Sequence, residues 1–153
     1  MRVHARRTLP LLLAVVSACG QVPGMFRQQG NQTATAPSII EIRRDATNNT
    51  AFRRVLTTGR HGQVTVMHLA PGERIGLETH PEADQIQLVV AGKAEVIIDG
   101  QASSLRHGEM AFIPAGAAHD VAAAGSEPVK LIVIYAPPLH PAGEVEQTRP
   151  EEG

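Results

Sequence analysis

Short apolar runs separated by turn residues fill most of the chain and predict β-strands. Residues 64–69 alternate β-branched and polar side chains, the period of a strand that buries one face. The apolar run at 94–98 ends in Asp99-Gly100, a strong hairpin signal, and the chain resumes at 102–105. Four further strands are predicted, at 86–90, 110–113, 119–122 and 129–135. Strands that recur about every 8 to 12 residues, with no long helix, indicate a sandwich or small barrel.

Two stretches before the first clear strand have weaker patterns. Residues 39–42 are apolar enough to pair at the edge of a sheet, and residues 49–56 fit either a helical turn or a strand. The remainder is about 90 residues, enough for eight short strands, which is the number in a jelly roll. We therefore expect an all-β protein with a jelly-roll β-barrel.

Composition limits the chain to one folded domain and excludes one class of function. Its 153 residues are 42% hydrophobic and 19% charged, as in globular proteins. A net charge of −1 and only 3% aromatic residues provide neither a basic surface nor rings for stacking bases, so we expect no nucleic-acid binding. The single cysteine cannot form an internal disulfide, and its position is more informative.

The N-terminus has the three parts of an export signal. Three arginines precede an apolar run at 9–16, which ends in Val16-Ser17-Ala18-Cys19. The run is shorter than the roughly 20 residues that span a bilayer. Its end resembles the bacterial lipobox, in which cleavage leaves a lipid-modified cysteine as the first residue. We expect a signal peptide at 1–18 and lipidation of Cys19, and the alternative is an ordinary signal peptide with an incidental thiol.

The remaining boundaries follow from composition. Removal of residues 1–18 takes away three arginines and no acid, so the net charge changes from −1 to −4. Residues 19–38 are polar and rich in Gly and Pro, which predicts a flexible tether. We expect the folded domain at 39–143 and a polar tail at 144–153. The domain would be exported and held at a membrane of the bacterial cell envelope, on its periplasmic or extracellular side.

Four side chains of metal-binding type fall in the predicted strands and turns. Glu78 and His80 are two apart, so on a strand they point to the same face. A short turn then leads to Gln85 at the start of the next strand, and the Pro114-Ala115-Gly116 turn leads to His119. We expect these four donors to converge.

The spacing of these residues resembles both signature motifs of the cupin superfamily. The first motif corresponds to Gly72, Glu78, His80, Gln85 and Gly92, and the second to Gly108, Pro114, Gly116 and His119. Residues 49–143 are also similar to small single-domain cupins that carry a mannose-6-phosphate-isomerase-like label. The resemblance implies an RmlC-like barrel, a divalent metal, a sugar-like substrate and a homodimer. No phosphate-cradling loop accompanies the label, so it is not evidence of isomerase activity.

The chain departs from the superfamily pattern at three positions. Glu78 stands where histidine is usual, Gln85 where glutamate is usual and Ala123 where asparagine is usual. One carboxylate and two imidazoles resemble the facial triad of non-haem iron, with Gln85 as a neutral fourth ligand. Iron, manganese, nickel, zinc and copper all suit such a set. A divalent ion beside one carboxylate leaves positive charge, which favours a small anionic ligand.

Other polar residues are assigned to less specific roles. His68 alternates with Val64 and Val66 and is a candidate acid or base facing the same cavity. His61, His107 and His140 lie beside Gly or Pro and are assigned to solvated turns. Tyr135 is assigned to the core. Arg53-Arg54 is assigned to a solvated strand edge, although the pair could steer an anion.

Three classes of function remain open. The first is a metal-dependent enzyme with Lewis-acid isomerase or lyase chemistry, or with dioxygenase chemistry. The second is a binding module that holds a small molecule or metal without turnover. The third is a structural lipoprotein whose four polar residues only satisfy one another through hydrogen bonds.

Overall fold

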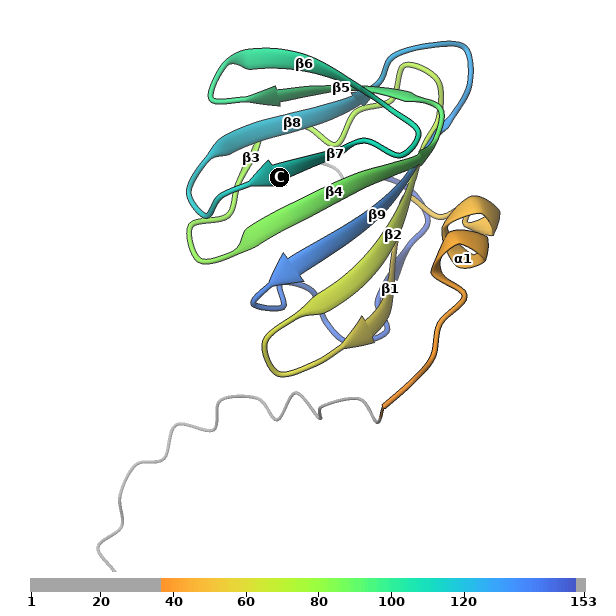
Figure 1. Ribbon diagram of the computed structural model, residues 1–153, viewed down its shortest axis with the longest axis vertical. Coiled ribbons are helices and arrows are strands. Elements are labelled where there is room, and N and C mark those ends of the chain that lie inside the picture. The colour runs from red at the N-terminus through yellow and green to blue at the C-terminus, as the bar shows by residue number, and fades with distance from the viewer. Residues whose placement is uncertain (1–36, 151–153) are drawn as a thin grey trace, which may run out of the picture. The chain divides into compact units, whose positions relative to one another are not determined.

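Two antiparallel sheets form the domain in the computed structural model, which describes residues 37–150 (Figure 1). The six-stranded sheet has the order β10-β1-β2-β9-β4-β7, with β1 at Arg53–Thr58, β2 at Gln63–Leu69, β4 at Asp84–Ala91, β7 at Met110–Ile113, β9 at Val129–Ala136 and β10 at Val145–Glu146. The four-stranded sheet has the order β3-β8-β5-β6, with β3 at Glu78–Thr79, β5 at Lys93–Ile98, β6 at Gln101–Arg106 and β8 at Ala118–Ala123. This arrangement confirms the all-β jelly-roll prediction.

The core lies between the inner faces of the two sheets. In β9, Val129, Leu131, Val133 and Tyr135 alternate with Lys130, Ile132 and Ile134, and the first set joins the main core cluster. Val96 and Val121 contribute to the same cluster from the smaller sheet. Because the side-chain period is two, a slip of one residue would turn this whole set outward. The hydrophobic pattern therefore fixes the register.

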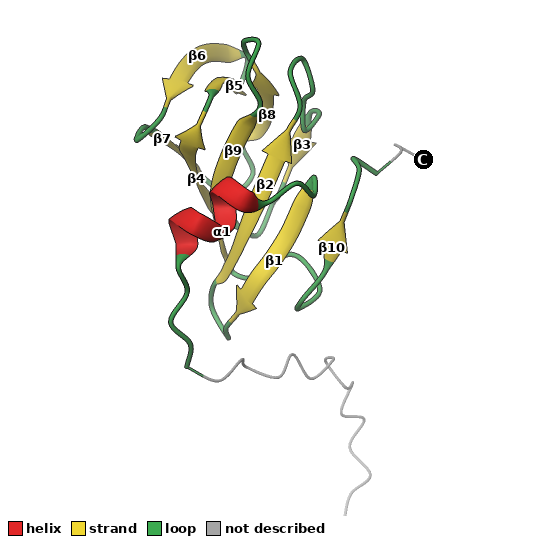
Figure 2. Cartoon of the chain, turned by 90° about the vertical axis from the view of Figure 1, so that its right-hand side faces the viewer, coloured by secondary structure: helices red, strands yellow, loops and turns green. Residues whose placement is uncertain are grey.

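The edge strand expected at 39–42 is wrong. Helix α1 spans Ile42–Asn48 and packs across β9, β2 and β4 on the outer face of the large sheet (Figure 2). Ile42 and Ala46 are four residues apart, so they share one face of the helix, and Ala46 is fully buried. Only these two apolar positions carry the helical period, which explains why the sequence pattern favoured a strand.

The domain also extends past the boundary expected at 143. Val145–Glu146 forms β10, which pairs with the start of β1, so this part of the expected polar tail belongs to the sheet. A two-residue strand is too short to show a period, and its ion pair with β1 is formed between residues 93 apart in sequence. In the ambiguous stretch at 49–56, β1 begins at Arg53. Cys19, the expected signal peptide and most of the tether lie outside the described residues.

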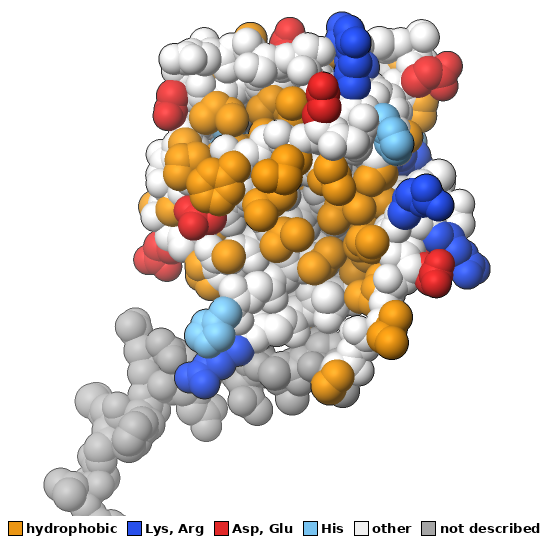
Figure 3. Space-filling model, in the orientation of Figure 1, with side chains coloured by type: hydrophobic (Ala, Val, Ile, Leu, Met, Phe, Trp, Pro, Cys, Tyr) orange, Lys and Arg blue, Asp and Glu red, His pale blue; other side chains and the backbone are white. Residues whose placement is uncertain are grey.

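An apolar area covers the outer face of β7, β4 and β9 (Figure 3). Met110 and Phe112 are each 54% exposed and Ile134 is 38% exposed. Contiguous apolar surface of this kind is characteristic of an interaction site. The homodimer expected from the sequence stays a prediction. No helix within residues 37–150 is long and apolar enough to cross a bilayer.

Two motif glycines with similar backbone angles have very different surroundings. Gly92, between β4 and β5, has φ +79°, and a Cβ there would lie 2.4 Å from the Pro128 carbonyl oxygen. Gly108, between β6 and β7, has φ +86°, and a Cβ there would have open space within 4 Å beyond its chain neighbours. Both positions need the left-handed conformation, and Gly92 also needs the absence of a side chain.

We predict that Gly92→Ala destabilises the domain by about 3 kcal/mol or more, because backbone strain and a main-chain clash add. Gly108→Ala, the matched control, should cost only the conformational strain of about 1 to 2 kcal/mol. Urea unfolding monitored by circular dichroism measures both. Equal losses in the two variants would contradict the close approach of Pro128.

Candidate metal centre

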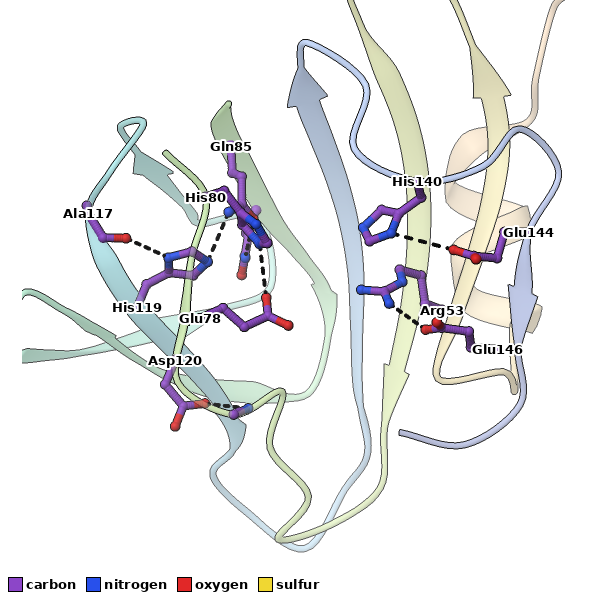
Figure 4. Close-up of polar contacts among 12 residues, drawn as sticks. Arg53, Glu78, His80, Gln85, Ala117, His119, Asp120, His140, Glu144 and Glu146 are labelled. Carbon is purple, nitrogen blue, oxygen red and sulfur yellow. Dashed lines mark hydrogen bonds and ion pairs between the residues drawn. The ribbon is translucent and has the colours of Figure 1, made fainter. Parts of the chain in front are cut away.

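Three of the four predicted donors meet at one end of the barrel. Glu78 lies on β3, His80 follows directly, and His119 lies on β8 opposite Glu78 in the antiparallel register. One ligand atom from each side chain lies within 4.8 Å of the others (Figure 4). The turn at 81–84 and the β3–β8 pairing thus bring residues about 40 positions apart in sequence to one point.

The His119 ring is held with one nitrogen available for coordination. Its Nδ1 lies 2.9 Å from the Ala117 carbonyl oxygen, which can only accept, so Nδ1 carries the proton. The Nε2 atom therefore carries the lone pair that could bind a metal, and His119 is only 1% exposed. A backbone carbonyl that fixes the tautomer of a histidine is the usual second contact of a metal ligand.

Gln85 reaches the same point from β4, as the sequence predicts. Its Nε2 lies 2.9 Å from His119 Nε2 and donates to that lone pair. Its Oε1 accepts a hydrogen bond of 3.2 Å from Gln87, two residues along the same strand face. Gln87 is not among the residues predicted for the site. A second polar residue two positions after Gln85 was the available signal, because both side chains must then point into the barrel.

Glu78 and His80 complete the cluster. Glu78 Oε2 lies 3.2 Å from His80 Nε2, and both side chains are partly exposed, at 30% and 22%. The ring of His80 lies 5.5 Å from that of His119, centroid to centroid. One carboxylate and two imidazoles suit a divalent transition metal with oxygen and nitrogen ligands. Partial exposure leaves one side of the cluster accessible to a small molecule.

Comparisons with known proteins agree with this architecture. A family model described as "Cupin domain" matches residues 65–135. The crystal structure of BH2720 from Bacillus halodurans superimposes with a TM-score of 0.74 at 39% identity, covering 76% of this chain and 93% of that one. The chain belongs to the cupin family.

Two curated relatives are described as uncharacterized proteins. YrkC of Bacillus subtilis is 40% identical over 119 residues, which are 74% of this chain and 64% of YrkC. L612 of Acanthamoeba polyphaga mimivirus is 33% identical over 120 residues, which are 75% of this chain and 74% of L612. The chain therefore spans just under two thirds of the first relative's length.

The hypothesis that His68 faces the cavity of the cupin barrel is wrong. His68 pairs with Lys130 across β2 and β9, on the face opposite the core residues Met67 and Leu131. On that outer face its neighbour Val66 packs against Ala46 of α1. Burial and the positive charge of Lys130 lower the pKa of His68. His68 does alternate in step with Val64 and Val66, but all three side chains lie on the outer face of β2 and not in the barrel.

A second polar cluster in the barrel was missed by the sequence analysis. Tyr135 is 2% exposed, and its ring lies 6.3 Å from that of His80 and 5.0 Å from that of His140. Burial raises the pKa of Tyr135 to about 12, so its hydroxyl keeps its proton at physiological pH. Arg53 forms an ion pair with Glu146 (Figure 4), and its positive charge and a hydrogen bond offset part of the rise in the Tyr135 pKa.

His140 belongs to this cluster and not to a solvated turn. The Gln63 amide holds the loop, since it accepts from the His140 backbone N–H and donates to the His140 carbonyl oxygen. His140 Nδ1 then lies 3.5 Å from Glu144 Oε2. Burial, followed by the positive charge of Arg53, lowers the pKa of His140 to about 4. Gln63 reaches this loop because it pairs with Tyr135 across the sheet, and such a long-range pairing leaves no local pattern in the sequence.

We predict that His140 makes the stability of the barrel depend on pH. In the unfolded chain its imidazole takes up a proton near its ordinary pKa of 6.5, whereas the folded barrel resists this until about pH 4. Stability is therefore complete above pH 6.5 and is lost as the pH falls toward 4, by up to about 3 kcal/mol. His140→Gln should remove this part of the pH dependence.

Urea unfolding of wild type and His140→Gln at pH 7 and pH 4.5 measures the difference. His107→Gln, at an exposed turn, is the control and should behave as wild type. Identical pH dependence in wild type and His140→Gln would contradict a buried neutral imidazole.

Proposed function

We propose that the chain is a cell-envelope lipoprotein whose cupin barrel holds a divalent metal ion and binds or converts a small anionic molecule beside it. The observation that carries this proposal is the convergence of Glu78, His80 and His119, with Gln85 in contact with His119. Iron, manganese, nickel, zinc and copper all suit these ligands. The ion would supply Lewis-acid chemistry at a carbonyl or hydroxyl oxygen, or redox chemistry if it is iron or copper.

The residues present fit such an ion. His119 offers Nε2 because its proton is held on Nδ1 by Ala117. His80 offers Nε2 when its proton moves to Nδ1, and Glu78 then stands 3.2 Å from that nitrogen as a further ligand. Rotating the Gln85 and Gln87 amides together by 180° keeps their hydrogen bond and turns Gln85 Oε1 toward His119. The Tyr135 hydroxyl would remain a proton donor close to His80.

A binding module without turnover is the second candidate. The observation that favours it is the hydrogen bond of 2.9 Å from Gln85 to His119, which satisfies the imidazole lone pair without a metal. A sensor or carrier would use the same barrel and the same anionic ligand. Metal content separates this candidate from the first.

We predict near-stoichiometric metal in the full-length protein, measured by elemental mass spectrometry after metal supplementation. His80→Ala and His119→Ala each remove one imidazole ligand and should lower metal affinity at least about tenfold. His107→Ala, exposed and remote in the fold from Glu78, should retain the metal. A wild-type barrel that stays empty would contradict the metal proposal and favour the binding module.

The membrane anchor is proposed from the sequence alone. Cys19 follows an apolar run and two small residues, the arrangement that lipid modification requires in the lipobox it resembles. Stable membrane anchoring takes two lipid chains, or one lipid chain together with a patch of basic residues.

We predict that the full chain expressed in bacteria carries lipid and sediments with membranes, whereas Cys19→Ser carries none. Ser17→Ala keeps a small residue before the cysteine and is the matched control. Intact mass spectrometry and incorporation of labelled palmitate measure both. Wild-type protein that is cleaved without lipid would contradict the anchor.

A further inference from the structure

Arg53 is a buried cation inside the barrel. It lies opposite Met67 in the β1–β2 register, on the core-facing side of β1, and its side chain is only 9% exposed. The adjacent Arg54 lies on the other face, is 38% exposed and pairs with Asp45. The solvated edge expected from the sequence therefore describes Arg54 and not Arg53.

The hydrogen-bonding capacity of Arg53 is only partly used. One terminal nitrogen lies 2.5 Å from Glu146 Oε2, on β10. A guanidinium carries five N–H donors, and the buried Nε of Arg53 has no hydrogen-bond partner among residues 37–150. The buried Nε2 of His140, in the same cluster, is also without one in that range. An unsatisfied buried donor of a charged group is costly, so this cluster favours a polar ligand.

A pocket of about 250 Å³ lies between Arg53 and Glu78, the carboxylate of the metal centre. Arg53 and Glu78 both border it, and the other wall residues are Phe52, Ile75, Leu77, Arg149 and Pro150. Pockets for drug-sized ligands are roughly 300 to 1,000 Å³, so this one suits a smaller molecule. Such a molecule would touch the carboxylate ligand of the metal at one end and a guanidinium at the other.

The charges around the pocket select an anion. The Arg53 guanidinium and a divalent ion stand against the carboxylates of Glu78 and Glu146, which leaves an excess of positive charge. The planar fork of arginine matches a carboxylate in two-point contact. Glu146 neutralises part of the charge of Arg53, which favours a singly charged group over a doubly charged phosphate.

We propose that Arg53 binds the carboxylate of a small organic acid whose hydroxyl or carbonyl oxygen reaches the metal centre at Glu78. This assignment rests on the proposed metal function, and it names the substrate class and its anchor. Glu146 acts as a positioning residue, because it holds one terminal nitrogen of the guanidinium from β10, while Nε is without a partner among residues 37–150. The apolar side chains of Phe52, Ile75 and Leu77 would pack against the carbon chain between the two ends.

The test is calorimetric titration of the metal-loaded, full-length protein with glycolate, 3-hydroxypropionate and 4-hydroxybutyrate. These acids place the hydroxyl at increasing distance from the carboxylate, and their neutral amides are the matched ligands. We expect at least one acid to bind at least tenfold more tightly than its amide. Equal affinity of every acid and its amide, or no binding of any acid, would overturn the proposal. Tighter binding of inorganic phosphate than of any acid would also overturn it.

Variants separate the role of Arg53 from general electrostatics. The double variant Arg53→Met, Glu146→Gln removes both charges, so no buried carboxylate is left unpaired. It should lose at least tenfold in acid affinity, with circular dichroism and metal content as in wild type. Arg53→Lys keeps the positive charge but lacks the planar two-point donor. Its acid affinity should lie between those of the wild type and the double variant. Arg54→Met should bind as wild type, and a loss equal to that of the double variant would contradict the assignment.

Metal-free protein distinguishes this inference from the proposed function. If the wild type takes up no metal but binds an acid through Arg53, the metal proposal fails and the carboxylate site stands. If metal is stoichiometric but acid binding is unchanged in the double variant, the metal proposal stands and the role of Arg53 is refuted.

Discussion

The register of β9 in the middle of the six-stranded sheet determines where the polar groups of the barrel lie. Tyr135 stands opposite Gln63 on β2 and opposite Gln85 on β4, and all three point inward. Gln85 contacts His119 at the metal centre, whereas Gln63 holds the loop that carries His140. A slip of one residue would turn Tyr135 outward and separate both clusters. The same alternation that builds the apolar core thus also places the site.

Polarity changes along the inner face of β9. Val129, Leu131 and Val133 pack into the core, and the polar clusters gather only at Tyr135. Polar groups in a barrel are costly unless they find partners, and most do, as Gln63, Gln85 and His119 show. Among residues 37–150 the exceptions inside the barrel include Gln87 Oε1 beside the metal centre and Arg53 Nε and His140 Nε2 in the second cluster. The apolar end of the barrel therefore supplies stability, and the end around Tyr135 holds polar atoms that a ligand could satisfy.

The sequence predicted what depends on a local period or a fixed spacing. Seven strands follow from apolar alternation, and Glu78, His80, Gln85 and His119 follow from the spacing of two motifs. It did not predict what depends on long-range pairing. The inward side of Arg53 follows from the β1–β2 register and its partner comes from β10, and the burial of His140 is set by Gln63, 77 residues away. Alternation placed His68 with Val64 and Val66, but only the packing of α1 shows that this face is the outer one.

The two proposed ligands of the barrel, the metal ion and the organic acid, are coupled through charge. The coupling arises because Glu78 is the single carboxylate of the metal centre. The Arg53–Glu146 pair is close to neutral as a unit, so most of the attraction for an anion at Glu78 would come from the metal ion. A carboxylate bound at Arg53 would in turn add negative charge next to the ion and hold it more firmly. Because such coupling is reciprocal, each ligand raises the affinity for the other by the same factor. The number of carboxylates equals that of the superfamily pattern, because Glu78 replaces a histidine where Gln85 replaces the glutamate, so the protein supplies one negative charge and leaves part of the metal's charge for the acid to neutralise.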